Sequence, residues 1–231
     1  MDANLIATMD PEDRQLIQDQ IEYYRGRAPE YDRSSTPPGD PLDAHGAILE
    51  QALHRFAPRG KLLELACGTG NWTRRLRGTD CVITALDSSP EMIELHRRKL
   101  RDPRIHYITT NLFEWIPETQ FDVVMFTFWL SHVPIWRFEQ FWDLVASCLA
   151  PGGRVWFADE TPLGDWRGQE FIDKDRQIVR RTLLNGREHR AVKVFWDPRE
   201  LEDRLSTLGW DITVTSTGAF YWGEGRRAAN V

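Results

Sequence analysis

Two glycines and one acid stand at the ends of two neighbouring apolar runs. Residues 61–66 lead into Cys67-Gly68-Thr69-Gly70, and Asp87 ends the next run, nineteen positions after Gly68. Glycines let the backbone turn sharply and approach a ligand closely, and free N–H groups at a helix start favour a polar or anionic group. A carboxylate at this spacing can bind both ribose hydroxyls of a nucleoside. The pattern predicts a nucleoside site; a tight turn with Asp87 as a helix cap is the structural alternative.

One histidine stands where proton transfer could take place. His132 lies six residues after Phe126, which is the last apolar position of the run 121–126. An imidazole has an ordinary pKa near neutrality and is an effective general base. His132 is therefore the candidate catalytic residue. The alternative is a histidine that packs against, or caps, a helix beginning at Pro134.

The remaining polar residues give no pattern for a metal or a disulfide. Asp159 and Glu160 follow the apolar run 154–158, and we expect them to be solvated loop acids rather than ligands of an amine or metal. No acidic cluster has clear spacing for a divalent metal, so we predict no metal site. The three cysteines are sparse and form no C-x-x-C pair. Such a set is typical of a reducing compartment, and we expect a cytoplasmic protein.

The elements that must position these residues alternate in type. Short apolar runs, expected as buried strands, are separated by segments expected as helices. The expected strands are 61–66, 81–86, 105–108, 121–126 and 154–158, and the expected helices are 11–25, 42–56, 71–76, 90–100, 134–149, 169–184 and 198–208. The alternation predicts an α/β, Rossmann-like, doubly wound and mostly parallel sheet. The carboxyl ends of its strands would share one edge, where ligands bind.

Both ends of the chain and one insertion depart from this alternation. Residues 1–40 are expected to form an N-terminal helical lid that ends in a polar loop, and residues 41–231 the main domain. Residues 210–217 and 219–222 predict an antiparallel hairpin that ends the sheet, with its turn at Gly218. Residues 160–196 are expected to be an insertion after strand five that covers the substrate.

The same segments resemble motifs of the class I S-adenosylmethionine-dependent methyltransferases of the bacterial small-molecule type. Glu64-Leu-Ala-Cys-Gly-Thr-Gly resembles motif I, residues 85–93 resemble the second motif, and residues 110–115 resemble the adenine-contacting segment. Residues 121–133 and 149–155 are similar to the segments around strands four and five, and residues 23–32 to the lid. Two positions depart from the family pattern, which often has glycine at Ala66 and aspartate at Asn111.

The resemblance implies S-adenosylmethionine as the cofactor and a set of residues that bind it. Gly68 and Gly70 would face its methionine part and Asp87 its ribose, and Phe128 would lie beside the methionine part or the sulfonium. The implied cofactor-binding residues are Tyr24, Tyr31, Glu64, Ala66, Gly68, Gly70, Asp87, Ser88, Met92, Asn111, Leu112 and Phe128. The implied activity is transfer of a methyl group to an oxygen or nitrogen of a small molecule, with secondary metabolism as one setting.

The composition and charge of the chain limit the classes of partner that we expect it to bind. The 231 residues carry 35 acids and 29 bases, a net charge of −6, which argues against a general nucleic-acid binder. The uncharged stretch 123–136 is too short to span a membrane, and the N-terminus has no signal-peptide pattern. Two alternatives stay open: an NAD(P)-dependent oxidoreductase, against which Thr73 counts, and a methyltransferase-like binding protein without activity. The oligomeric state is not predicted.

Overall fold

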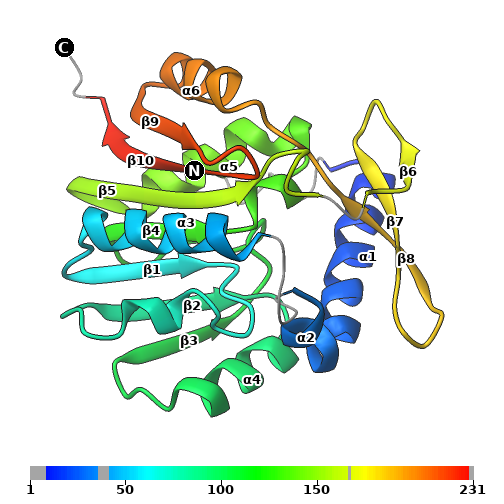
Figure 1. Ribbon diagram of the computed structural model, residues 1–231, viewed down its shortest axis with the longest axis horizontal. Coiled ribbons are helices and arrows are strands. Elements are labelled where there is room, and N and C mark those ends of the chain that lie inside the picture. The colour runs from blue at the N-terminus through cyan, green and yellow to red at the C-terminus, as the bar shows by residue number, and fades with distance from the viewer. Residues whose placement is uncertain (1–8, 36–41, 166–167, 229–231) are drawn as a thin grey trace.

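A seven-stranded sheet forms the centre of the molecule (Figure 1). The computed structural model describes residues 9–35, 42–165 and 168–228. The strands of this sheet are β1 (Lys61–Leu65), β2 (Val82–Asp87), β3 (Ile105–Thr109), β4 (Phe121–Thr127), β5 (Leu149–Glu160), β9 (Trp210–Ser216) and β10 (Phe220–Arg227). The first five are parallel, whereas β10 pairs antiparallel with β5 and with β9. The predicted Rossmann-like sheet with a closing antiparallel hairpin is confirmed.

The strand order places the site. The order is β3-β2-β1-β4-β5-β10-β9, so the chain runs outward in one direction from β1 and in the other from β4. Ligands bind at such a reversal, beyond the carboxyl ends of the strands. The glycine loop follows β1 and His132 follows β4, so both lie at this point.

Helices cover both faces of the sheet. The helices α3 (Asp43–Phe56) and α4 (Pro90–Leu100) pack on one face, and α5 (Phe138–Cys148) and α6 (Pro198–Thr207) pack on the other. Each face has its own apolar cluster, to which the fully buried neighbours Trp156 and Phe157 contribute on opposite sides of β5. Local capping sets the start of α4, where the Ser89 hydroxyl accepts the N–H of Met92 at 3.1 Å.

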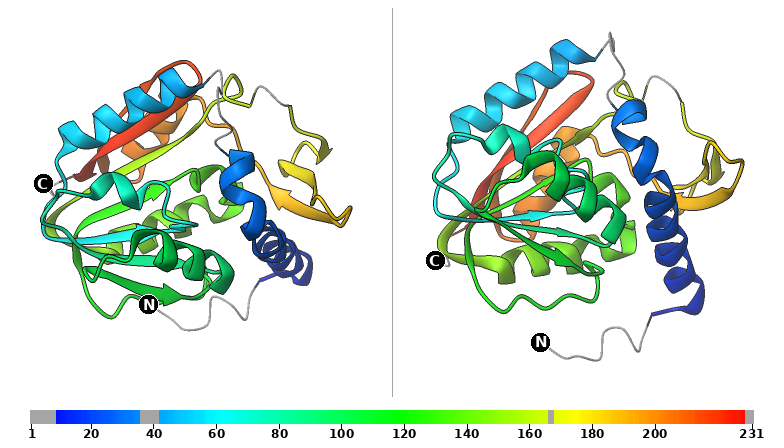
Figure 2. Two further views of the ribbon diagram at one scale, coloured as in Figure 1. Left: turned by 60° about the horizontal axis from the view of Figure 1, so that its bottom comes forward. Right: turned by 90° about the horizontal axis from the view of Figure 1, so that it is seen from below.

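The N-terminal segment lies across the carboxyl ends of the parallel strands (Figures 1 and 2). It consists of α1 (Pro11–Arg27), a single turn, η1 (Ala28–Glu30), and α2 (Tyr31–Ser35). A three-stranded antiparallel sheet of β6 (Phe171–Asp173), β7 (Ile178–Thr182) and β8 (Glu188–Val192) lies beside α1. Leu16 of α1, only 1% exposed, joins the apolar cluster of α5 and α6.

The predicted helix over residues 169–184 is wrong, because this stretch forms β6 and β7. Ile178 and Val179 pair with Val192 and Ala191 of β8. Both have β-branched side chains, which pack well on a pleated surface. Tertiary pairing with a segment later in the chain therefore overrides the local helical pattern.

Two other boundaries differ from the expectations. The predicted helix over 71–76 is reduced to one 3₁₀ turn, η2 (Thr73–Leu76). Strand β5 begins at Leu149 rather than at residue 154, so it includes the segment Pro151-Gly152-Gly153. The predicted polar loop lies mostly in residues 36–41, outside the described residues. No helix in the described ranges is long and apolar enough to cross a membrane.

Candidate functional site

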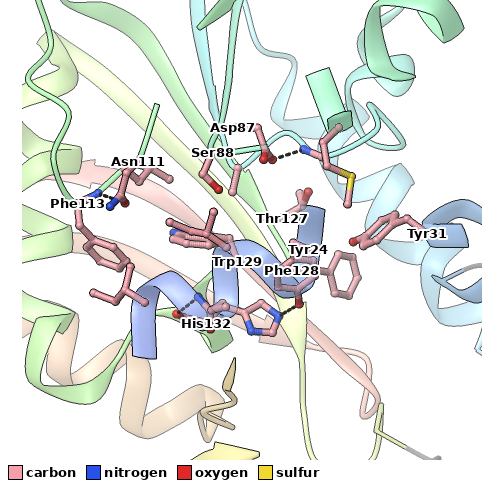
Figure 3. Close-up of a pocket in the computed structure, with 17 residues that line it drawn as sticks. Tyr24, Tyr31, Asp87, Ser88, Asn111, Phe113, Thr127, Phe128, Trp129 and His132 are labelled. Carbon is pink, nitrogen blue, oxygen red and sulfur yellow. Dashed lines mark hydrogen bonds between the residues drawn. The ribbon is translucent and has the colours of Figure 1, made fainter. Parts of the chain in front are cut away.

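A pocket opens at the carboxyl ends of β1, β2 and β4, under α1 and α2 (Figure 3). Its empty volume, including open solvent at the mouth, is about 680 Å³. The predicted residues that line it are Tyr24, Tyr31, Ala66, Gly68, Asp87, Ser88, Met92, Asn111, Leu112, Phe128 and His132. Glu64 and Gly70 were predicted with them but do not line the pocket.

Sequence reasoning missed other lining residues. These are Ile17, Gln20, Ile21, Phe113, Thr127 and Trp129. The first three share one face of α1 with Tyr24, because positions 17, 20, 21 and 24 recur at helical spacing. That spacing was a usable signal. Phe113 follows the predicted Leu112. Thr127 and Trp129 were not in the predicted cofactor-binding set, although their place at the carboxyl end of β4, where ligands are expected, was a usable signal.

The loop after β1 has the backbone conformation that glycine favours. Gly68 has φ +53 and Gly70 has φ +80. A Cβ atom on Gly68 would meet no atom within 4 Å, so this position leaves open space for a ligand. A Cβ atom on Gly70 would come within 2.5 Å of the His96 ring, so Gly70 is needed for packing. Ala66 also has a positive φ, +51, which is unfavourable for alanine.

Asp87 connects the loop to the next strand. Its Oδ2 accepts the N–H of Gly68 and its Oδ1 accepts the N–H of Ser89, both at 2.9 Å. Burial raises the pKa of this carboxyl, and the backbone donors partly oppose that shift. Each oxygen keeps further acceptor capacity. The carboxylate can therefore hold the loop and still receive hydroxyl groups from the pocket.

Glu64 lies buried next to the loop with an incomplete set of partners. Its Oε2 accepts from the Thr73 hydroxyl at 2.5 Å, while its Oε1 has no hydrogen-bond partner in the described residues. Burial is the main cause that raises the pKa of Glu64 to about 8; the Thr73 hydrogen bond opposes it and the charge of Asp87 adds to it. An unpaired buried carboxyl oxygen is costly. The site thus fits a ligand that brings a donor or a positive charge close to this loop.

His132 is held at both ring nitrogens. Nδ1 lies 2.8 Å from the carbonyl oxygen of Val192. Nε2 lies 2.7 Å from the hydroxyl of Tyr24 (Figure 3). A carbonyl only accepts, so Nδ1 carries the proton and Nε2 is the acceptor. Burial lowers the pKa of His132 well below its usual value, and the positive charges of Lys193 and Arg181 lower it further. His132 is therefore neutral at pH 7, with its lone pair facing the pocket.

Polar contacts tie the lid to the glycine loop. The Asp32 carboxylate of α2 accepts from the Thr69 hydroxyl at 2.5 Å and from the Asn71 amide at 3.1 Å. It also pairs with Lys99 of α4 at 2.6 Å. These contacts join α2 to the glycine loop and to α4.

The expectation of solvated acids after β5 is wrong for Asp159. This residue is fully buried, and its Oδ2 accepts the N–H of Ser131 at 2.8 Å. Next to it, Glu160 pairs with Lys193, which is 2% exposed and donates to the Ser131 hydroxyl at 3.0 Å. These residues hold the turn that carries His132. In the described parts of the chain, no group of three or more His, Cys, Asp or Glu residues is placed to hold a metal ion.

Comparison with known proteins relates this site to methyl transfer. A family model described as a methyltransferase domain matches residues 62–153. The structure of DhpI with S-adenosylhomocysteine is 41% identical; the match covers 93% of this chain and 98% of that one, with a TM-score of 0.81. A complex of DhpI with S-adenosylmethionine and a ligand designated HEP has the same identity, covers 91% and 97% of the two chains, and has a TM-score of 0.78.

Curated relatives are more distant. An uncharacterized methyltransferase of Anoxybacillus flavithermus is 24% identical over 183 residues, which are 79% of this chain and 84% of that protein. A demethylmenaquinone methyltransferase of Tropheryma whipplei is 29% identical over 126 residues, about half of each chain. The residues that the family model matches include the glycine loop and Asp87.

Proposed function

Because this chain belongs to the class I S-adenosylmethionine-dependent methyltransferases, we propose that it methylates an oxygen or nitrogen of a small, negatively charged molecule, with His132 as general base. The observation that carries the proposal is the state of His132. It is neutral, its Nε2 is an acceptor, and it lines the same pocket as Asp87 and Gly68. Cofactor and acceptor would thus share one enclosure, with His132 on the acceptor's side.

The residues around the glycine loop fit the cofactor. Asp87 has acceptor capacity left for the two ribose hydroxyls, and the open space at Gly68 admits a close approach. Met92 and Leu112 give the adenine an apolar lining. When bound, the cofactor supplies an electrophilic methyl group on its sulfonium.

His132 would receive the proton of the acceptor. Methyl transfer requires the attacking atom to lie in line with the sulfur–carbon bond, so positioning supplies much of the rate. In this state the Tyr24 hydroxyl donates to Nε2 of His132. A hydroxyl or amine of the acceptor would take that place and pass its proton to Nε2 as the new bond forms.

The charges around His132 favour an acceptor with a negative group. Arg27 lies over the Tyr31 ring at 4.9 Å, and the buried Nε of Arg181 has no hydrogen-bond partner in the described residues. Lys193 is paired with Glu160, whereas neither arginine forms a salt bridge within the described residues. An anion would balance this charge and, by its field, stabilise the imidazolium form of His132. It would thereby strengthen a base whose pKa is otherwise depressed.

The test is a screen with labelled S-adenosylmethionine over matched acceptors. Each set shares one skeleton and carries a carboxylate or phosphonate, a neutral amide, or an ammonium group. We expect methylation of the anionic members, and Arg181→Gln should raise their KM about tenfold without changing cofactor affinity. The matched control is Arg180→Gln, whose exposed side chain pairs with Glu170 and Glu188. Equal turnover of neutral and anionic members would contradict the charge assignment.

His132 is tested separately with an acceptor that the screen identifies. His132→Gln should lower kcat by about a hundredfold while cofactor affinity stays the same. Cofactor binding without turnover of any acceptor would instead favour the binding protein without activity. We further propose a cytoplasmic location, for which the support is that all three cysteines are buried and free.

A further inference from the structure

Gln20 is a buried amide on the lid helix with both ends engaged. Its side chain is 3% exposed, its Nε2 donates to the carbonyl oxygen of His132 at 3.1 Å, and its Oε1 accepts the N–H of Val192 at 2.9 Å. The imidazole of His132 donates in turn to the carbonyl oxygen of Val192. Three hydrogen bonds thus close a ring through α1, the turn after β4, and β8.

The partners determine every direction in this ring. A backbone carbonyl can only accept and a backbone N–H can only donate. The amide of Gln20 therefore has one satisfactory orientation, and the imidazole of His132 has one satisfactory tautomer, with the proton on Nδ1. Nε2 is left for the pocket, where it meets Tyr24, one helical turn after Gln20 on the same helix.

We infer that Gln20 is a positioning residue for His132: through this ring it holds the imidazole in the Nδ1–H tautomer, so that Nε2 can act on the acceptor. The inference rests on the role proposed above for His132. It gives α1 a second task besides covering the pocket. Through Gln20, α1 supplies the buried partner of both the Val192 N–H and the His132 carbonyl.

Two substitutions separate positioning from mere packing. Gln20→Leu keeps an apolar volume but leaves the N–H of Val192 and the carbonyl of His132 without partners. Gln20→Glu makes the ring depend on pH. A protonated carboxyl can donate to His132 and accept from Val192, whereas a carboxylate can only accept. Burial raises the pKa of a carboxyl, so the transition should lie above the ordinary value of about 4.3. Gln18→Leu is the matched control. Gln18 is exposed on the same helix, and its side chain donates to Glu22.

The first measurement needs no cofactor. The ¹⁵N shifts of the imidazole nitrogens of His132, assigned with His132→Gln, report its tautomer. We expect the Nδ1–H form alone in the wild type and in Gln18→Leu, and a mixture in Gln20→Leu. In Gln20→Glu the pure form should return as the pH is lowered. Because that comparison uses one protein at two pH values, it tests whether Gln20 controls the tautomer of His132 even if Gln20→Leu does not fold.

The second measurement is kinetic. Displacement of a reacting group costs large factors in rate, so Gln20→Leu should lower kcat about tenfold or more with cofactor affinity unchanged, and Gln20→Glu should regain kcat at the lower pH. A Gln20→Leu protein with a pure Nδ1–H tautomer and wild-type kcat would overturn the inference. If His132→Gln retained full kcat, the proposed base would fail instead, while the tautomer measurement would still test Gln20.

Discussion

The hydroxyl of Tyr24, on the lid helix, lies 2.7 Å from Nε2 of His132, on the turn after β4. Burial raises the pKa of Tyr24, so the tyrosine is the donor. With Tyr24 as the donor, this hydrogen bond requires a neutral His132, because an imidazolium has no lone pair and would donate to the tyrosine oxygen instead. The direction of the hydrogen bond between α1 and the turn after β4 therefore depends on the charge of His132.

The first prediction concerns stability at low pH. Since the folded-state pKa of His132 lies well below 6.5, protons bind preferentially to the unfolded chain in the window below 6.5. The contribution of His132 is complete above pH 6.5 and is lost as the pH falls. In that window it should lower the free energy of unfolding by up to about 1.4 kcal/mol per pH unit. Urea unfolding between pH 7.5 and 5 gives the free energy of unfolding of the wild type and of His132→Gln at each pH. The wild-type free energy should fall more steeply with falling pH, and equal slopes would refute the prediction.

The second prediction concerns activity. With a depressed pKa, His132 is already neutral at pH 7. For an acceptor that must lose a proton, kcat/KM, which reports the free enzyme, should therefore rise through an apparent pKa below 6.5 and stay level from pH 7 to 8. A pH–rate profile checks this. A rise centred above 7 would show that another group is the base.

The third prediction concerns Asp87. Asp87→Ala should weaken S-adenosylmethionine binding at least about tenfold, because charge-assisted hydrogen bonds contribute about 1.5–3 kcal/mol each. It also removes the acceptor for the N–H groups of Gly68 and Ser89. Asp87→Asn should be milder, since one oxygen remains. Titration calorimetry measures the affinity, and circular dichroism confirms folding; an unchanged affinity in a folded variant would rule out the assignment.

The fourth prediction concerns the lid contact. Asp32→Ala removes the contacts with Thr69, Asn71 and Lys99. Partly exposed pairs contribute about 0.2–1 kcal/mol, so the dissociation rate of the cofactor should rise about two- to fivefold. The control is Glu94→Ala, which removes an exposed pair on α4 away from the lid. Stopped-flow displacement gives the dissociation rate of the cofactor from each variant. Equal rates for Asp32→Ala and Glu94→Ala would show that Asp32 does not hold the lid.

The fifth prediction concerns Ala66, whose φ is +51. A left-handed conformation costs an L-residue about 1–2 kcal/mol, and glycine loses about 0.5–1 kcal/mol more entropy on folding. Ala66→Gly should therefore stabilise the fold by about 0.5–1 kcal/mol in urea unfolding. Ala85→Gly, at a fully buried position of β2 without positive φ, should destabilise it. A lower free energy of unfolding in both variants would contradict the strain at Ala66.

The sequence alone determined the sheet and the half of the pocket that faces the cofactor. Strand and helix patterns, the cap at Ser89 and the loop from Gly68 to Gly70 are local, and parallel topology then brings the ends of β1, β2 and β4 together. Asp87 could be placed beside Gly68 for this reason, before any contact between them was known.

The half of the site that faces the acceptor was decided only by tertiary structure. Gln20 meets His132 across 112 positions and Val192 across 172, and no local pattern encodes such partners. The same holds for β7, where pairing with β8 overrode the helical pattern. Burial is also a property of the folded chain, and it turned Asp159 from an expected surface acid into a support of the turn that carries His132. The charge and tautomer of His132 follow from that burial and those partners, because desolvation and hydrogen-bond direction exist only once distant segments have packed together.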